Sequence, residues 1–259
     1  MRVNTTKAKL NEGKVVFGGI ISGFAPEIVE VLALCGYDFV FLDCEHGPMS
    51  FDQVEQMVRA AEAAGITPIA RIPDQQDATL LRYLDRGVQG VIVPHVNTKE
   101  QAERIAGAAR YFPDGHRGAA SGRAHDYNVT VSREESMQFI NDNVLVIPMC
   151  EEVEAVKNLE AILTLPGIDI VHCASSDLRQ SMGNPPLAEV REVMHDVVQR
   201  VRAGGKHAGI GGNSPGDTAG VGRLIEAGAN FVTISALSLL RVGAEQFRDA
   251  SIRAGGRSV

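Results

Sequence analysis

The sequence predicts a single (β/α)8 barrel, and three observations lead to this prediction. The chain has 259 residues, close to the roughly 250 that one α/β barrel uses. Short runs rich in β-branched residues alternate eight times with longer segments of helical period, the pattern of parallel strands joined by crossover helices. No linker rich in Pro or Ser divides the chain. We therefore expect residues 1–259 to form one domain, while length alone leaves two small domains or an open doubly wound sheet as alternatives.

Eight runs have the length and composition of strands in a parallel sheet. In chain order they are Val15 to Ile21, Asp38 to Asp43, Thr67 to Ile72, Gly90 to Pro94, Val144 to Met149, Ile168 to Cys173, His207 to Ile210 and Asn230 to Ser235. A segment of helical period follows each run. These segments are Pro26 to Leu34, Phe51 to Ala64, Asp77 to Arg86, Lys99 to Arg110, Glu152 to Leu163, Leu187 to Ala203, Gly216 to Glu226 and Leu237 to Ala254.

Three other segments bear on the kind of ligand or on the loops around it. The stretch from Gly18 to Gly23 does not match G-x-G-x-x-G after the first strand, which disfavours a dinucleotide fold. The glycine-rich stretch from Gly209 to Gly216 follows the seventh strand, where barrels often bind phosphate, but no Lys or Arg accompanies it before Arg223. The long non-periodic stretch from Tyr111 to Val131 is either a lid or a solvated excursion or oligomer contact.

Composition excludes several classes of protein. The formal charge of -7 repels phosphodiester backbones, so we expect no nucleic-acid partner. No apolar run reaches about 18 residues and the first residues lack a signal-peptide core, so we expect a cytoplasmic protein with no membrane partner. The four cysteines show no C-x-x-C spacing, which argues against a zinc knuckle or a redox pair.

Polar residues directly after predicted strands are the candidates for a site, because barrel enzymes place their chemistry at the carboxyl ends of the strands. This criterion selects Asp43, Glu45 and His46 after the second strand, Arg71 at the third, Glu151 and Glu152 after the fifth, and Ser175, Ser176 and Asp177 after the sixth.

Glu151 and Asp177 follow neighbouring strands and are candidate ligands of one divalent cation. Two carboxylates suit Mg²⁺ or Mn²⁺ and leave positions for water or substrate, whereas zinc prefers His or Cys. The structural alternative is that each carboxylate caps the helix that follows it.

His46 and Arg71 are the other candidates for chemistry. A histidine near a strand end suits general-base catalysis at neutral pH. An arginine in an apolar strand needs an anionic partner, which is either a substrate or a structural ion pair. The remaining strand-end and loop histidines are expected to be structural and stay outside the site: His95, His125 and His172.

Five segments resemble the HpcH/HpaI aldolases, which are class II, metal-dependent enzymes acting on 2-keto-3-deoxy sugar acids and 4-hydroxy-2-oxo acids. The resemblance covers nearly the whole chain, in order. The segments are Phe41 to Pro48, Pro68 to Arg71, Leu84 to Pro94, Arg110 to Gly118, and Glu151 through Asp177 and Leu178.

The resemblance implies a (β/α)8 barrel of the phosphoenolpyruvate- or pyruvate-binding type. It implies a hexamer, a trimer of dimers that exchange their last helix. It also implies a divalent cation, Mg²⁺ or Mn²⁺ with Co²⁺ as a further candidate, and a 2-oxo acid substrate. The matching positions are Glu151 and Asp177 for the metal, Arg71 for the enolate, His46 for the general base, Asp85 for the acid that orients it, and Asp43 and Glu45 for acids around metal-bound water.

The implied reaction is reversible cleavage of the oxo acid to pyruvate and an aldehyde, with backbone N–H groups of Ser175, Ser176 and Asp177 binding the carboxylate. Relatives commonly have Gly-Pro-Ala-Asp before the metal aspartate and Gln-Ile-Glu at the fifth strand. This chain has Ala174 before the two serines, and Met149 and Cys150 before Glu151. A related lyase or decarboxylase acting on another 2-oxo acid such as oxaloacetate, or a binding protein without turnover, is therefore an alternative.

Overall fold

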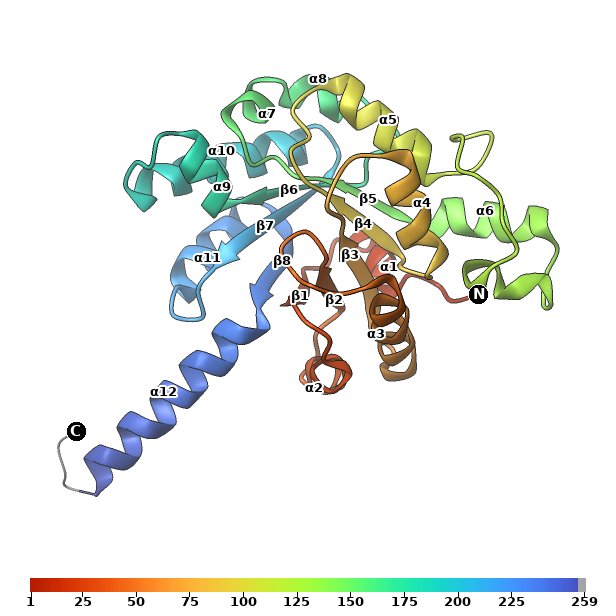
Figure 1. The fold of residues 1–259 in the computed structure, drawn as a ribbon. Coiled ribbons are helices and arrows are strands. Elements are labelled where there is room, and N and C mark those ends of the chain that lie inside the picture. Colours follow the sequence, from red (N-terminus) through yellow and green to blue (C-terminus); the bar gives the residue numbers. More distant parts are fainter. Residues whose placement is uncertain (256–259) are drawn as a thin grey trace.

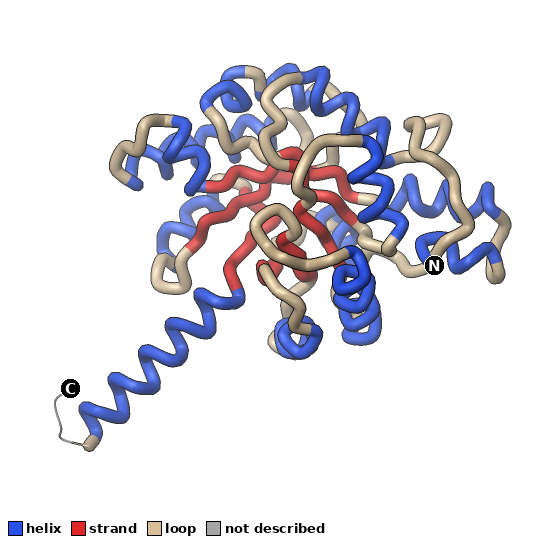
Figure 2. The backbone as a smooth tube through the Cα atoms, in the orientation of Figure 1, coloured by secondary structure: helices blue, strands red, loops and turns tan. Residues whose placement is uncertain are grey.

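The computed structural model describes residues 1–255. Eight parallel strands form one sheet in the order β5-β4-β3-β2-β1-β8-β7-β6, and helices surround it (Figures 1 and 2). A single bridge between Met149 and His172 links the two ends of the sheet. The barrel is therefore nearly closed, and the predicted (β/α)8 fold is confirmed.

The strands agree with the predicted runs, with small shifts at their ends. They are β1 Val16–Ile21, β2 Phe39–Asp43, β3 Thr67–Arg71, β4 Gly90–Val93, β5 Leu145–Pro148, β6 Ile170–Ala174, β7 His207–Asn213 and β8 Ala229–Ser235. The largest shift is in β7, which continues through the glycine-rich stretch to Asn213. This extension pairs with β6 and β8, and the register against β8 shifts between Ile210 and Asn213. A Gly-rich stretch that sequence composition favours as a loop thus forms part of the barrel wall.

The helices include all the predicted segments and several others. They are α1 Thr5–Asn11, α2 Pro26–Leu34, α3 Phe51–Ala64, α4 Asp77–Asp85, α5 Lys99–Ala109, the 3-10 segment η1 Arg123–Asn128, α6 Arg133–Asn143, α7 Val153–Lys157, α8 Leu159–Leu163, α9 Ser175–Ser181, α10 Leu187–Ala203, α11 Thr218–Glu226 and α12 Ala236–Ala254. The segment predicted as one helix from Glu152 to Leu163 is divided at Asn158, whose side chain donates a hydrogen bond to the backbone of Asn97. The sequence does not predict α1 and α6, and it predicts only the start of α9, as a helix N-terminus at Ser175 to Asp177.

The core has two layers. Side chains of alternate strand residues fill the barrel, where Phe39 and Phe231 stack with ring centroids 4.2 Å apart. A larger layer of aliphatic side chains lies between the sheet and the helices. Because the strands are parallel, their carboxyl ends meet at one end of the barrel.

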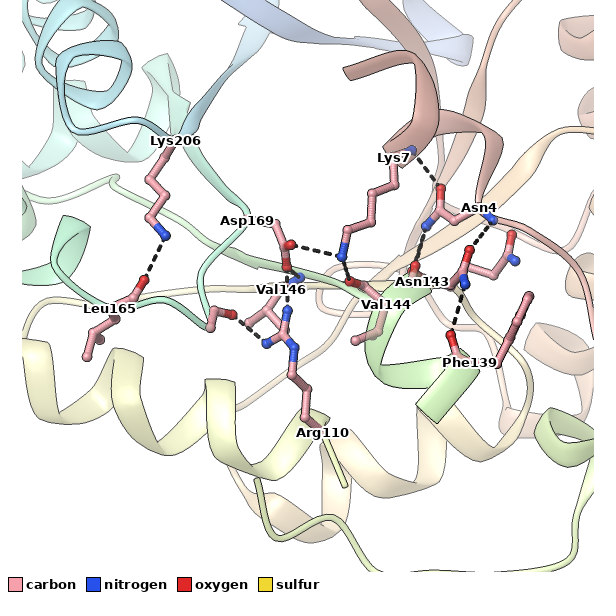
Figure 3. Close-up of polar contacts among 12 residues, drawn as sticks. Asn4, Lys7, Arg110, Phe139, Asn143, Val144, Val146, Leu165, Asp169 and Lys206 are labelled. Atoms are coloured by element: carbon pink, nitrogen blue, oxygen red, sulfur yellow. Dashed lines mark hydrogen bonds and ion pairs between the residues drawn. The ribbon is translucent and has the colours of Figure 1, made fainter. Parts of the chain in front are cut away.

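A polar network lies at the opposite end of the barrel, where β5 and β6 begin (Figure 3). Asp169 accepts hydrogen bonds from Arg110 Nη2 at 2.7 Å and from the backbone N–H of Val146 at 2.9 Å, and Lys7 Nζ lies 3.1 Å from its other oxygen. Asp169 also donates its own N–H to the carbonyl of Val146. These contacts join the start of β6 to β5 where the regular ladder is missing.

The long loop after α5 is anchored from inside. His125 is buried and its ring nitrogens lie 2.8 Å from the Tyr111 hydroxyl and 2.6 Å from the Ser136 hydroxyl. Burial lowers the pKa of His125, so the ring is neutral in this network. Both ring nitrogens of His125 thus contact side chains of the fold.

Helix α12 points away from the barrel (Figure 1). No residue of this helix is buried, and Leu237, Leu240 and Phe247 are at least 65% exposed. Within residues 1–255, no helix has the length and apolar character needed to span a membrane.

Candidate active site at the carboxyl ends of the strands

Asp43 ends β2 and organises the loop after it. Its carboxylate accepts hydrogen bonds from the backbone N–H of His46 at 3.2 Å and from the Ser22 hydroxyl at 3.3 Å. The loop passes so close to the strand that a Cβ on Gly47 would lie 2.2 Å from the carbonyl oxygen of Asp43, so only glycine fits there. The turn leaves His46 at the rim of the barrel, with 67% of its side chain exposed.

Arg71 ends β3 beside Asp43 in the strand ladder. Its Nη2 lies 3.0 Å from Asp43 Oδ1, and its Nε lies 3.1 Å from Glu45 Oε2. The side chain is only 12% exposed. The ion pair that the sequence left as the structural interpretation is therefore present, and it fixes the guanidinium at the same end of the barrel as His46.

Glu151 follows β5 and is buried, with 2% of its surface exposed. Its pKa is raised to about 7, chiefly because burial penalises the charged carboxylate and also because the charge of Asp177 lies nearby. The backbone N–H of His95 donates to Glu151 Oε1 at 2.9 Å and opposes this shift. The two predicted metal ligands are thus near enough for their charges to interact.

These two carboxylates fit a divalent cation. A buried carboxylate beside a second one is electrostatically unfavourable, and a cation between them would offset both the burial and the repulsion. Within residues 1–255, no group of three or more His, Cys, Asp or Glu side chains is arranged to hold a metal ion. A candidate donor set of two carboxylates would suit a hard cation that keeps water or substrate oxygens as its other ligands.

Ser175 and Ser176 begin α9, and Asp177 lies in its first turn. The Ser175 hydroxyl is buried and donates to the carbonyl of Gly212 at 3.2 Å, whereas Ser176 is exposed. A Cβ on Gly212 would lie 2.1 Å from Ser175 Oγ. The glycine-rich end of β7 therefore admits Ser175, and this hydroxyl is used within the fold.

Asp85 lies away from the other predicted residues. It is the last residue of α4, which runs back from the carboxyl end of β3 toward the start of β4, so within one chain it sits far along the barrel from His46. Its Oδ1 instead accepts a hydrogen bond from Arg117 Nη2 at 2.8 Å. The expected contact between Asp85 and His46 is absent from the described residues of the single chain.

A cavity of about 380 Å³ also lies apart from the strand-end carboxylates. Its lining includes Leu84, Gln89, Asn143 and Val144, which precede β4 and β5 at the other end of the barrel. This cavity therefore does not coincide with the candidate active site, which is inferred instead from the charged residues that follow the strands.

His95 lies among the charged residues of the candidate site, and sequence reasoning left it out. It follows β4, and its Nδ1 lies 2.7 Å from Glu152 Oε1 and 3.7 Å from Glu151 Oε1. The signal was available, because His95 directly follows the predicted run from Gly90 to Pro94 and meets the same strand-end criterion as Arg71. It was set aside because strand-end histidines are commonly structural.

Comparison with known proteins identifies the family of the chain. The sequence model of the HpcH/HpaI aldolase/citrate lyase family matches residues 17–237. The chain is 32% identical over 257 residues to a protein from Shigella sonnei named 2-keto-3-deoxy-L-rhamnonate aldolase, covering 97% of this chain and 94% of that protein. A protein of the same name from Escherichia coli K12 is also 32% identical, with the same coverage.

Solved structures agree over the whole fold. The citrate synthase SbnG superposes with a TM-score of 0.85 at 30% identity, covering 97% of this chain and 98% of that one. A HpcH/HpaI aldolase/citrate lyase family protein from Burkholderia cenocepacia has a TM-score of 0.85 at 29% identity, covering 96% of this chain and 99% of that one. The match over most of the chain, together with the fold, shows that this protein belongs to the HpcH/HpaI aldolase/citrate lyase family.

Proposed function

We propose that this protein is a metal-dependent class II aldolase that reversibly cleaves a 4-hydroxy-2-oxo acid or a 2-keto-3-deoxy sugar acid to pyruvate and an aldehyde. One observation carries the proposal: buried Glu151, whose pKa is raised in part by the charge of Asp177, lies at the end of the barrel that also holds Arg71 and His46. The names of the relatives, 2-keto-3-deoxy-L-rhamnonate aldolases, support the class of reaction.

Glu151 and Asp177 would hold Mg²⁺ or Mn²⁺, with Co²⁺ as a further candidate. A bound cation supplies Lewis-acid polarisation of the 2-oxo carbonyl, which makes the pyruvate enolate accessible. Backbone N–H groups of Ser175, Ser176 and Asp177 begin α9 and would bind the substrate carboxylate.

His46 acts as the general base in the cleavage direction. It removes the proton of the C4 hydroxyl as the bond between C3 and C4 breaks, and the bonding electrons pass to C3 and on to the oxygen at C2. The Arg71 guanidinium stabilises the negative charge on that oxygen. The aldehyde, whose carbonyl carbon is C4, then leaves, and protonation of C3 completes pyruvate. Asp43 and Glu45 hold Arg71 in place for this role, while the role implied for Asp85 stays a prediction.

We further propose that the protein is an oligomer in which copies exchange α12, within a hexamer built as a trimer of dimers. The eighth helix of a closed barrel ordinarily packs on the outside of the sheet. Here α12 projects away with its apolar residues exposed, and Val31 and Leu34 on α2 are also more than half exposed. A second copy of α12 would cover such a surface.

The function is tested by incubating the protein with Mg²⁺ or Mn²⁺, pyruvate and short aldehydes and measuring aldol product. We expect product that EDTA abolishes, and a loss of about 10²-fold or more in rate for His46→Ala. The control is His116→Gln, which removes an equally exposed histidine that contacts Asp77 on the outer helices. Decarboxylation of oxaloacetate without any aldol product would favour the alternative lyase, and metal-dependent pyruvate binding without turnover would favour a binding protein.

A further inference from the structure

His95 has a backbone conformation that residues other than glycine rarely adopt. Its φ of 55° lies in the left-handed region, which costs free energy for a residue other than glycine and persists only where neighbours enforce it. Two side chains do so. Glu151 accepts from the His95 N–H at 2.9 Å, and Gln75 Nε2 donates to the His95 carbonyl at 2.8 Å. The main chain is therefore fixed from both sides, independently of the imidazole.

The imidazole is in turn aimed by Glu152. Nδ1 lies 2.7 Å from Glu152 Oε1, which leaves Nε2 as the ring nitrogen that faces the site. Nε2 lies 3.8 Å from Glu45 Oε1, beyond hydrogen-bonding distance. The side chain is 56% exposed, and Nε2 makes no hydrogen bond within residues 1–255, so it can bond a ligand in the mouth of the barrel.

The surroundings of the ring are acidic. Carboxylate oxygens of Glu45, Glu151 and Glu152 all lie within 4 Å of ring nitrogens of His95. A second carboxylate on the aldehyde half would be repelled at this side of the mouth. A hydroxyl group is neutral and can donate to or accept from Nε2 in either tautomer of the ring.

We propose that His95 determines which aldehyde the site accepts, by binding a hydroxyl group on a neutral aldehyde half, while Glu152 orients the ring and disfavours aldehydes that carry a carboxylate. This inference rests on the proposed aldolase function and adds the specificity of the same site. A site built to bond a hydroxyl discriminates against the analogue that lacks it, because the polar group of the protein is then left without a partner.

The test compares glycolaldehyde with propanal, which differ by a hydroxyl in place of a methyl group, and with succinic semialdehyde, which carries a carboxylate. The quantity measured is the ratio of kcat/KM values for condensation with pyruvate at fixed metal. Comparing this ratio between variants removes the different intrinsic reactivities of the aldehydes. His95→Asn and His95→Gly both suit the left-handed backbone, so they remove the imidazole without straining the turn.

We expect the ratio of glycolaldehyde to propanal to fall about tenfold in both His95 variants. Glu152→Gln keeps a hydrogen-bond acceptor for Nδ1 but loses the charge, so the ratio of succinic semialdehyde to propanal should rise there. His116→Gln should leave both ratios unchanged. If both His95 variants are active and their ratio of glycolaldehyde to propanal is unchanged, the proposed role of His95 is overturned while the proposed aldolase function stands. No product from any aldehyde with the wild-type protein would instead overturn the proposed function, and this inference with it.

Discussion

Nη2 of Arg71 lies 3.0 Å from Oδ1 of Asp43, across adjacent strand ends and almost out of contact with water. A second carboxylate, that of Glu45, lies 3.1 Å from Nε of Arg71, so one guanidinium contacts two carboxylates. In the proposed mechanism the same guanidinium stabilises the enolate oxygen, and the two acids keep it aimed at the site.

Replacing Arg71 with Ala should therefore affect both activity and stability. We expect kcat/KM to fall by about 10²-fold or more, because the charge that stabilises the enolate is lost. We also expect a loss of roughly 3 kcal/mol in the free energy of unfolding, because the buried carboxylate of Asp43 is left without its partner. Steady-state kinetics and urea unfolding measure the two effects. Metal affinity should persist, and its loss would point to a purely structural ion pair.

A matched control is Arg59→Ala. Arg59 Nη2 lies 2.7 Å from Glu55, one turn away on the exposed side of α3. Exposed pairs of this kind contribute little, so the expected change is below about 1 kcal/mol with no change in activity. Equal losses in the two variants would contradict the special position of Arg71.

Metal affinity should depend on pH because of Glu151. Its pKa is raised to about 7 in the metal-free protein, so the carboxyl holds a proton below that pH. A cation must displace this proton, and its affinity should fall about tenfold per pH unit below pH 7 and level off above it. Calorimetric titration of Mn²⁺ between pH 5.5 and 8 measures this. Affinity that is flat across the range, or retained in Glu151→Gln, would count against Glu151 as a ligand.

Stability should decrease in acid because of His172, which is fully enclosed in the barrel between Phe41 and Phe231. Burial, together with the charge of Arg71, lowers its pKa to about 3. A lowered histidine pKa means that the unfolded chain binds the proton first, so stability is complete above about pH 6.5 and decreases below it. The decrease is about 1.4 kcal/mol per pH unit, or about 2 kcal/mol by pH 5.

Urea unfolding of wild type and His172→Gln between pH 5 and 7.5 checks this. The variant lacks the titrating group, so its stability should change less with pH even if it is lower throughout. His116→Gln, at an exposed site, should follow the wild-type curve. Parallel curves for wild type and His172→Gln would show that another group is responsible.

Helix α12 should be needed for assembly. Leu240 and Phe247 are exposed on it by 65% and 77%. Replacing both with Glu should shift the protein to a smaller species in light scattering, because charges cannot be buried in an interface without partners. Glu245→Lys on the same helix is the control for a change of charge alone. An unchanged mass for the double variant would contradict the exchange of this helix.

The strands could be predicted well because short apolar runs of β-branched composition report directly on burial on both faces of a parallel sheet. Sequence reasoning missed α1 and α6, whose few buried residues give little helical periodicity: only Thr6 and Leu10 in the first, Ser136 and Asn141 in the second. Their start signals are side-chain caps from Asn4 and Ser132, which a search for apolar stripes does not detect.

The candidate site was predicted in part. The strand-end criterion selected Glu151, Asp177, Arg71 and His46, because strand direction alone brings such residues to one end of the barrel. It did not reveal that Arg71 contacts both Asp43 and Glu45, since side-chain pairing depends on rotamers and loop shape. Asp85 came from the resemblance and not from this criterion. Its place at the end of α4 puts it at the other end of the barrel from His46 within one chain.

The central claim is that the carboxylates of Glu151 and Asp177 support formation of the pyruvate enolate with a bound divalent cation. Exchange of the pyruvate methyl protons in D₂O, followed by proton NMR, tests it without any assumption about the aldehyde. We predict that the methyl signal disappears faster with protein and Mg²⁺ or Mn²⁺ than with either alone, and that EDTA, Glu151→Gln or Arg71→Ala abolishes the gain. Exchange that is indifferent to EDTA, or absent while pyruvate and metal are bound, would contradict the account.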